Sequence, residues 1–499
     1  MKRLRKVFVC AAAVLLCAVA AHAESPEEFF NRINREYDEF AQRIQKDFDS
    51  FRDKCNREYA EFMKQPWKPV TPIAPERRPT RPGPTPQPDV IVNNDQSPTV
   101  IPAPIRFIDS LSKPVPEPHP MPIEPVKPAK PDTKSQQIEI TFYGATVKLS
   151  KPELSNYSLR GNRTSDIADG WNQLSMAETD PLLYDLLSAR ESLALPDWHY
   201  LLLIDKAASI LIPRNHNEQT LLAGFLLNQS GFDIRFAMST TDGRLHLLFN
   251  SSSTFYNRAR YRLNNGNYYA LSEPRGAVSV CDFNTPGETK LTVAVDRVPN
   301  LPYSPGNKRE ITLPGGKSLS VAVNRNLIDL MADYPDAALR AGAESRWLAY
   351  ALMPTSDEIR REAYPILRNL VSGMNQYDAV NTLLKVAQQF PYGYDSEIWG
   401  RERVFFMEES WHYPYSDCED HAINFAHMVR DLLGLKVCLV SYPNHLSASV
   451  AITDGSARGS IYRHGGQDYM SCDATYFGAP AGSIMPQFKS TAATLIPVK

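Results

Sequence analysis

Three residues near the C-terminus have the types and the order that a thiol-based reaction needs. Cys418 lies in an acidic run, residues 416–421, and is followed by His445 and then by Asp473. A thiol, an imidazole and a carboxylate can act as one unit, because the imidazole accepts the thiol proton and the carboxylate orients the imidazole. The elements around these residues must therefore bring the three side chains together.

The segment that begins at Cys418 predicts a helix. Apolar residues recur at helical spacing at 422, 425, 426, 429, 432 and 433, and Gly434 is a favourable stop. Asp417 is a candidate N-cap, which places Cys418 in the first turn, where backbone N–H groups and the helix dipole stabilise an anion. Such a position can lower the pKa of a cysteine from about 8.5 to roughly 3.5–7.5.

The acidic neighbours of Cys418 act against this effect. Asp417, Glu419 and Asp420 surround the thiol with negative charge, which disfavours its ionisation. If their side chains point outward, as cap and first-turn residues, they support the helix more than they oppose the thiolate. The state of the thiol therefore depends on where the three carboxylates lie.

Strands follow the helix. The residue types predict strands over 436–442, 445–452 and 467–472, with breaks between them. His445 begins the second strand on its less apolar face, where an imidazole can meet a partner. Asp473 comes directly after the third strand.

Three short motifs in this region resemble the core of the transglutaminase-like superfamily, a branch of the papain-like cysteine enzymes: Asp417-Cys418-Glu419-Asp420, Tyr442-Pro443-Asn444-His445 and Cys472-Asp473-Ala474-Thr475-Tyr476. The resemblance covers roughly residues 357–485, about a quarter of the chain. It implies that Cys418 is the nucleophile, His445 the base and Asp473 the orienting residue. Two positions depart from the pattern: His421 stands where relatives often carry Arg, and Ala474 where Pro often follows the Asp.

The implied activity is attack of Cys418 on an amide carbonyl, followed by release of a thioester. We expect a peptidase or amidase that transfers the acyl group to water, because water is the abundant acceptor outside a cell. A peptide or another amide would be the substrate. Two alternatives stay open: transfer from protein glutamine to an amine, and a non-catalytic scaffold that binds peptides.

An aromatic-rich loop, residues 391–415, precedes the nucleophile and is predicted to wall a substrate groove. Trp411, Tyr413 and Tyr415 are the expected substrate-binding residues, although such a loop could equally form a hydrophobic lid. His421 lies one helical turn from Cys418 and is a second candidate base. No paired metal-ligand spacing occurs, so we expect no metal and no cofactor.

The first 23 residues are typical of a secretory signal peptide, which predicts a periplasmic or secreted protein. No other stretch is apolar enough to span a membrane, so the mature chain is expected to lack a transmembrane segment. The whole chain has 54 basic and 56 acidic residues, and this balance indicates no nucleic-acid partner. After loss of the signal peptide five cysteines remain, too few for a disulfide framework.

Residues 27–64 carry an 11-residue repeat. Apolar residues at 33, 37 and 40 recur at 44, 48 and 51 and again at 55, 59 and 62. The period of 3.67 residues per turn predicts a long amphipathic helix with one apolar stripe. A single helix cannot bury that stripe alone, which favours a homo-oligomer or docking on a partner protein over packing on the chain's own globular part.

The remaining segments complete a multidomain α+β protein. Residues 65–133 are a Pro-rich linker with 20 of the 40 prolines, and regular helix or sheet is not expected there. We predict an α+β domain over 134–273 and a β-rich, sandwich-like module over 274–325. The transglutaminase-like catalytic domain would occupy 326–499.

Overall fold

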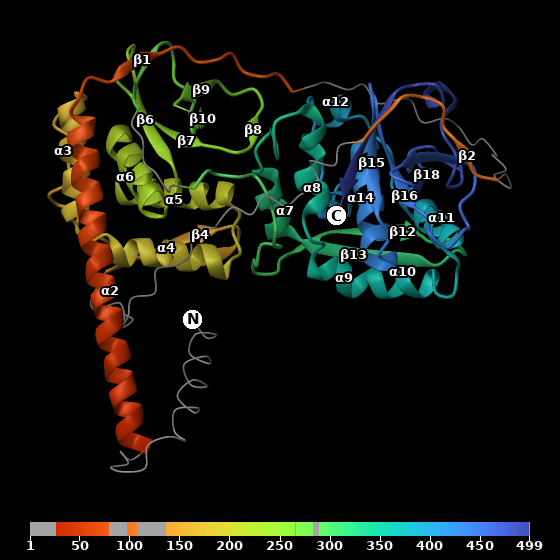
Figure 1. Ribbon diagram of the computed structural model, residues 1–499, viewed down its shortest axis with the longest axis horizontal. Helices are drawn as coiled ribbons and strands as arrows, with labels where there is room; N and C mark the ends of the chain where they lie inside the picture. The colour runs from red at the N-terminus through yellow and green to blue at the C-terminus, as the bar shows by residue number, and fades with distance from the viewer. Residues whose placement is uncertain (1–25, 79–96, 108–135, 265, 283–288, 499) are drawn as a thin grey trace. The chain divides into compact units, whose positions relative to one another are not determined.

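The computed structural model describes residues 26–78, 97–107, 136–264, 266–282 and 289–498 (Figure 1). The predicted signal peptide, 1–23, lies outside the described residues. Contacts divide the described residues into one unit with residues 26–59 and another that contains the described residues from 60 onward. Helices and several sheets occur together, so the α+β class is confirmed.

A single helix, α2 (Pro26–Met63), contains the 11-residue repeat. Its 38 residues run without interruption, as the period predicted. Several large apolar side chains along it remain exposed, namely Phe30, Tyr37, Phe40 and Phe51.

The first half of the large unit combines a helical layer with an antiparallel sheet. Its helices are α3 (Thr164–Met176), α4 (Asp180–Ser192), α5 (Asp197–Leu211) and α6 (His216–Gln229). The sheet has the order β1 (Lys68–Val70), β11 (Val278–Cys281), β6 (Ile234–Ser239), β7 (Leu245–Asn250), β10 (Gly266–Ala270) and β9 (Arg260–Leu263). Helix α6 packs on β6 and β7, and Trp171 on α3 contacts Phe225 and Phe236 edge-to-face in this core.

Smaller elements flank these layers. Strands β4 (Gln137–Phe142) and β5 (Ala145–Ser150) form a hairpin around Gly144. Strand β8 (Thr254–Phe255) pairs with β14 (Ala337–Ala338).

The prediction of a separate β-rich module over 274–325 is wrong. Strand β11 pairs with β6 and so belongs to the sheet of the preceding segment. Strands β12 (Pro305–Thr312) and β13 (Ser318–Asn324) form a hairpin on their own. The hairpin contacts helices α7 (Arg325–Ala332) and α9 (Asp357–Glu362) instead of a second sheet. Alternation indicates strands in this segment, but it does not specify the partner that covers them.

The last part of the chain contains the predicted reacting residues. Its remaining helices are α8 (Leu348–Leu352), α10 (Tyr364–Leu370), α11 (Gln376–Ala387), α12 (Asp395–Ile398), α13 (Met407–Ser410) and α14 (Cys418–Leu433), with 3-10 turns η2 (Ala343–Trp347) and η3 (Pro486–Phe488). The central strands are β15 (Val437–Tyr442), β16 (His445–Ala451), β17 (Ser460–His464), β18 (Gln467–Cys472) and β19 (Ala493–Val498). Helix α14 packs against β15 and β16, and α11 packs against α14 (Figure 1). Helix α13 also packs against α14.

The described parts of the Pro-rich segment contradict the prediction that it forms no regular sheet. Strand β2 (Thr99–Val100) pairs with β17 at one edge of the seven-stranded sheet, and β3 (Ile105–Phe107) pairs with β19 at the other edge. Strand β1 likewise lies at an edge. Edge strands tolerate nearby proline because one side of the strand needs no ladder hydrogen bonds.

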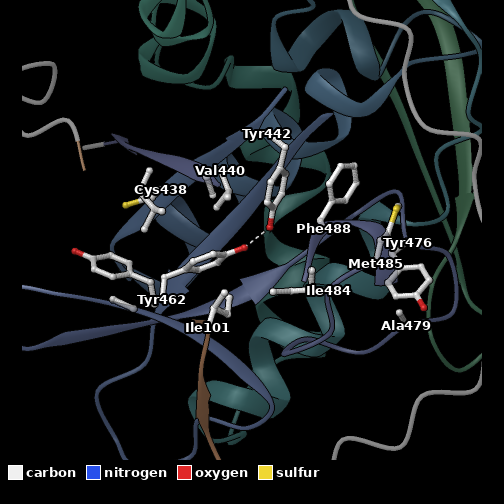
Figure 2. Close-up of a cluster of buried hydrophobic side chains, with 14 residues drawn as sticks. Ile101, Cys438, Val440, Tyr442, Tyr462, Tyr476, Ala479, Ile484, Met485 and Phe488 are labelled. Carbon is white, nitrogen blue, oxygen red and sulfur yellow. Dashed lines mark hydrogen bonds between the residues drawn. The ribbon is translucent and has the colours of Figure 1, made fainter. Parts of the chain in front are cut away.

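One face of the seven-stranded sheet carries a hydrophobic cluster (Figure 2). Cys438, Val440 and Tyr442 project into it from alternate positions of β15. The hydroxyl groups of Tyr442 and Tyr462 hydrogen-bond within the cluster. His445 is the cross-strand partner of Tyr442, so it begins β16 at the margin of this core.

Across the described residues, helices that are both long and apolar enough to cross a bilayer do not occur.

Candidate active site

The start of helix α14 has the predicted geometry. Asp417 is the N-cap, and its Oδ1 accepts from the Glu419 N–H at 3.2 Å. The Asp420 carboxylate accepts from the Asp417 N–H at 3.1 Å, which completes a capping box. Gly434 ends the helix in the left-handed conformation, with φ of 65°. Cys418 is therefore the first residue of α14, as the sequence predicted.

His445 and Asp473 form a hydrogen-bonded pair. The His445 Nε2 lies 2.8 Å from Asp473 Oδ2, and the two residues are 0% and 6% exposed. Asp473 Oδ1 also accepts from the N–H and the hydroxyl of Thr475, each at 3.0 Å. Because Nε2 faces Asp473, Nδ1 is the nitrogen that would exchange a proton with a thiol.

The charge of Asp473 is maintained despite its burial. Burial acts to raise the pKa of this carboxyl, but the attraction and hydrogen bond of His445, together with the bonds from Thr475, lower the pKa below its ordinary value. An ionised Asp473 can fix the tautomer of His445 and stabilise the imidazolium form. The pair thus has the geometry and the charge of the base half of a triad.

Phe488, in η3, holds the plane of the His445 ring. Their ring centroids lie 5.0 Å apart, and the planes differ by only 8°. Tyr442 stacks on Phe488 in turn, at 4.5 Å. The sequence did not point to Phe488, because a single aromatic 43 positions after the histidine carries no local pattern.

The Cys418 sulfur lies next to the start of β16. The backbone N–H of Leu446, the residue after His445, lies close enough to Cys418 to favour its thiolate. The thiol itself is 1% exposed and hydrogen-bonds to Glu419 Oε2 at 3.2 Å. The structure therefore brings Cys418 to the strand that carries His445, in a site closed to solvent.

The acidic side chains around Cys418 point inward, which is the arrangement that opposes thiolate formation. Asp417, Glu419 and Asp420 are all buried. Burial, together with the charges of Glu419 and Asp417, raises the pKa of Cys418 well above its ordinary value. Burial and mutual repulsion also raise the pKa values of Asp417 and Asp420. The resting thiol is therefore protonated at neutral pH, and the helix N-terminus does not overcome its surroundings.

The acidic group extends beyond the helix. Asp395, at the start of α12, has its pKa raised to about 7 by burial and by the nearby charge of Glu419, although the Arg403 N–H opposes this shift. Asp420 Oδ1 accepts from the Phe405 N–H at 2.7 Å. Carboxyls with raised pKa values can carry protons near neutral pH, which limits the negative charge beside the thiol.

Asp417, Cys418 and Glu419 are also the residues of the described chain best placed to hold a metal. One donor atom from each lies within 4.8 Å of the others. Thiolate and carboxylate ligands both suit Zn²⁺. A metal bound there would occupy the sulfur, so metal binding and nucleophilic attack by Cys418 exclude each other.

His421 lies closer to Asp473 than its position on α14 suggested. Asp473 acts to raise the pKa of His421, but burial dominates and lowers it to about 4. The ring is packed among Phe390, Tyr392 and Phe477. His421 therefore stays neutral, and the hydrogen bond of Asp473 is made to His445.

Trp411, one of the three predicted substrate-binding residues, does not line a groove. Trp411 is 0% exposed, and its Nε1 donates to Asn424 Oδ1 at 3.1 Å, so the indole packs inside the domain. Tyr413 is half-buried and stacks edge-to-face on Trp399. Tyr415 is 46% exposed and is the one of the three predicted substrate-binding residues that faces solvent.

Glu408 should make stability fall as the pH rises. It is buried on α13, where burial raises its pKa to about 7, although the Ser356 N–H, at 2.7 Å, opposes the shift. Because the folded pKa is above the unfolded one, its stabilising contribution is complete below pH of about 4.5 and is lost as the pH rises through about 7.

Glu408→Gln keeps an acceptor for the Ser356 N–H and removes the charge. At pH 8 we therefore expect its free energy of unfolding to exceed that of wild type by roughly 1–3 kcal/mol. Urea titrations at pH 5 and pH 8 measure the difference. The exposed Glu362→Gln is the matched control and should leave the pH dependence unchanged. Equal pH dependence in wild type and Glu408→Gln would contradict the assignment.

Comparisons of the chain with protein-family models, with curated proteins and with solved structures found no match. The function must therefore be inferred from the residues of the site and their chemistry.

Proposed function

We propose that the C-terminal part of this chain is a transglutaminase-like cysteine hydrolase that cleaves an amide through Cys418, His445 and Asp473. The observation that carries the proposal is the buried 2.8 Å bond between His445 and Asp473, beside a helix that begins at Cys418. A buried imidazole–carboxylate pair next to a thiol at a helix N-terminus is the arrangement that thiol nucleophiles use.

The state of the thiol determines how the reaction would begin. Because the pKa of Cys418 is raised, its proton must leave as the sulfur attacks, and His445 would accept it. The S–C bond forms at the amide carbonyl, and the imidazolium then donates that proton to the departing amine as the C–N bond breaks. Water attacks the resulting thioester, His445 accepts a proton from this water, and the acid product and the thiol are released.

The backbone supplies the groups that would stabilise the oxyanion. The first N–H groups of a helix have no acceptor within it, so the Cys418 N–H is a suitable donor. Trp411 does not serve in this role, because its Nε1 already donates to Asn424.

Substrate access requires a local opening. Cys418 is 1% exposed, and the segment before α12 lies over the entry to α14 through a hydrogen bond from the Gly393 N–H to the Ser416 carbonyl at 3.1 Å. The Ser416 N–H donates back to the Pro391 carbonyl at 3.2 Å. An opening of the site along this path would break these two backbone bonds.

The acceptor can be determined directly. A glutamine-containing peptide and a labelled primary amine are offered together to the purified protein, and ammonia and incorporated label are measured. We expect ammonia release without label, since no residue of the site suggests a binding position for an amine. Incorporation of label in step with ammonia would instead show amine transfer by the same triad.

A non-catalytic role is favoured by one observation. The buried, protonated Cys418, hydrogen-bonded to Glu419, is also what an inert structural thiol would show. If the site is catalytic, Cys418→Ala removes turnover. If the site only binds, wild type has no turnover to lose, and Cys418→Ala leaves peptide affinity within about twofold. Equal peptide binding with no turnover by wild type would favour the scaffold.

A further inference from the structure

The repeat in α2 places charged residues as regularly as apolar ones. Between residues 33 and 55, some apolar residues lie four positions after the previous apolar residue of the stripe. Each of these is directly preceded by a charged residue, namely Glu36, Arg43, Asp47 or Lys54. These four lie along one flank of the apolar stripe, and their signs alternate. Between the same limits the other flank, at positions 34, 41, 45 and 52, carries only one charge, Arg52.

The stripe itself is open to solvent along its described side chains. Tyr37, Phe40 and Phe51 are each more than half exposed, with Phe51 at 66%. Large exposed apolar side chains along one face of a helix mark an interaction surface. The charged flank indicates what covers it.

We propose that residues 33–55 of α2 pair in antiparallel orientation with the same segment of a second copy of this chain, centred on position 44. In this register the apolar layers are 33 with 55, 37 with 51, 40 with 48, and 44 with itself. A residue on the charged flank faces a residue of the second copy that is offset by two positions from the apolar pairing. This offset is usual for side chains beside the apolar seam of an antiparallel helix pair. Glu36 then faces Lys54 of the second copy, and Arg43 faces Asp47 of the second copy.

Every charged contact on this flank is attractive. The two-fold symmetry repeats both pairs, so four opposite-charge contacts line the seam. In a parallel pair, the charged flank of one copy would instead face the opposite flank of the second copy. Between residues 33 and 55, Arg52 is the only charged residue of that opposite flank. Charge complementarity therefore selects the antiparallel arrangement.

The charged side chains are positioned to make these contacts. Glu36 and Lys54 are more than half exposed, and their intrahelical partners, Arg32 at 3.0 Å and Glu58 at 3.8 Å, lie on the same helix surface. Within one helix Glu36 and Lys54 are about 27 Å apart, so they can meet only across two copies.

Disulfide trapping tests the orientation. With Ile33→Cys in the whole protein, mild oxidation should join Cys55 of one copy to the new thiol of the other, because the 33 and 55 positions share a layer. Wild type should not cross-link, since its two Cys55 residues would lie about 33 Å apart. Ile33→Cys with Cys55→Ser is the control and should also stay uncross-linked. Cross-linking of wild type through Cys55 would show a parallel pair and overturn the proposal.

Charge reversal tests the register. Glu36→Lys and Lys54→Glu should each raise the dimer dissociation constant about tenfold in sedimentation equilibrium, because each places like charges opposite one another at two symmetric points. The double variant should return to within about twofold of wild type. A double variant no tighter than either single one, or a wild type that is monomeric at all concentrations, would overturn the proposal. Neither result bears on Cys418.

Discussion

Cys418→Ala is expected to reduce amide hydrolysis to the background rate, a loss of at least about 10³-fold in kcat. Alanine removes the only atom that would form the covalent bond with the substrate. The fold should remain intact, because the substitution removes one buried sulfur and its contact with Glu419. Turnover assays on the purified protein, quenched at fixed times, measure the rate. A cooperative thermal unfolding transition shows that the variant is folded.

A second buried thiol provides the matched control. Cys281 is also buried, on β11, and burial raises its pKa to about 12. Cys281→Ala should keep kcat within about twofold of wild type, since this thiol has no place in the reaction. Equal activity of Cys418→Ala and Cys281→Ala would remove Cys418 from the mechanism.

The second large effect is expected for Asp473→Asn. Asparagine retains the shape of the side chain but has no charge to stabilise the imidazolium of His445, and its amide can hold the ring in the wrong tautomer. Loss of the corresponding carboxylate in a serine-protease triad costs about 10⁴ in kcat, so we expect a loss of about 10²–10⁴ with little change in KM. Initial rates over a range of substrate concentrations separate the two constants.

This variant should also alter the response to acid. The folded pKa of Asp473 is lowered, so its contribution to stability is present above the unfolded value and is lost as the pH falls through the folded one. Asp473→Asn lacks this contribution, and its acid unfolding should be less steep. Asp468→Asn, on the strand that ends just before Asp473 but in an exposed pair with Arg463, should match wild type in kcat. A full-rate Asp473→Asn enzyme would contradict an orienting role.

Local sequence patterns were sufficient for the elements that hold the site. The apolar period after Cys418 predicted α14, and the N-cap at Asp417 and the αL stop at Gly434 are where the residue types put them. The residue types and their breaks likewise predicted β15, β16 and β18, with Asp473 directly after the last. Each of these signals is contained in a short window, because caps, turns and alternation act between near neighbours.

Long-range packing explains what was missed. Burial of Asp417, Glu419 and Asp420 depends on segments far from α14, such as the loop whose Phe405 N–H meets Asp420. Phe488 reaches His445 only because η3 folds back onto the sheet, and β11 joins β6 across about 40 residues. Such contacts leave no periodic trace in the sequence.

Proline content was also a weak guide to strand formation. The segments 99–100 and 105–107 lie among prolines, yet they add the outermost strands of the seven-stranded sheet. Proline limits a strand to an edge without preventing it. The proline positions show where a central strand is excluded, but they do not show that a sheet edge is open for pairing.

Detection of an acyl-enzyme tests the central claim most directly. Wild type is mixed with a slowly hydrolysed activated amide and quenched in acid, and the peptide that contains residue 418 is weighed by mass spectrometry. The predicted result is an acyl adduct on Cys418 in wild type that is at least about tenfold less abundant in His445→Ala. An adduct that forms equally in both proteins, or that is found only on other residues, would contradict the proposed triad.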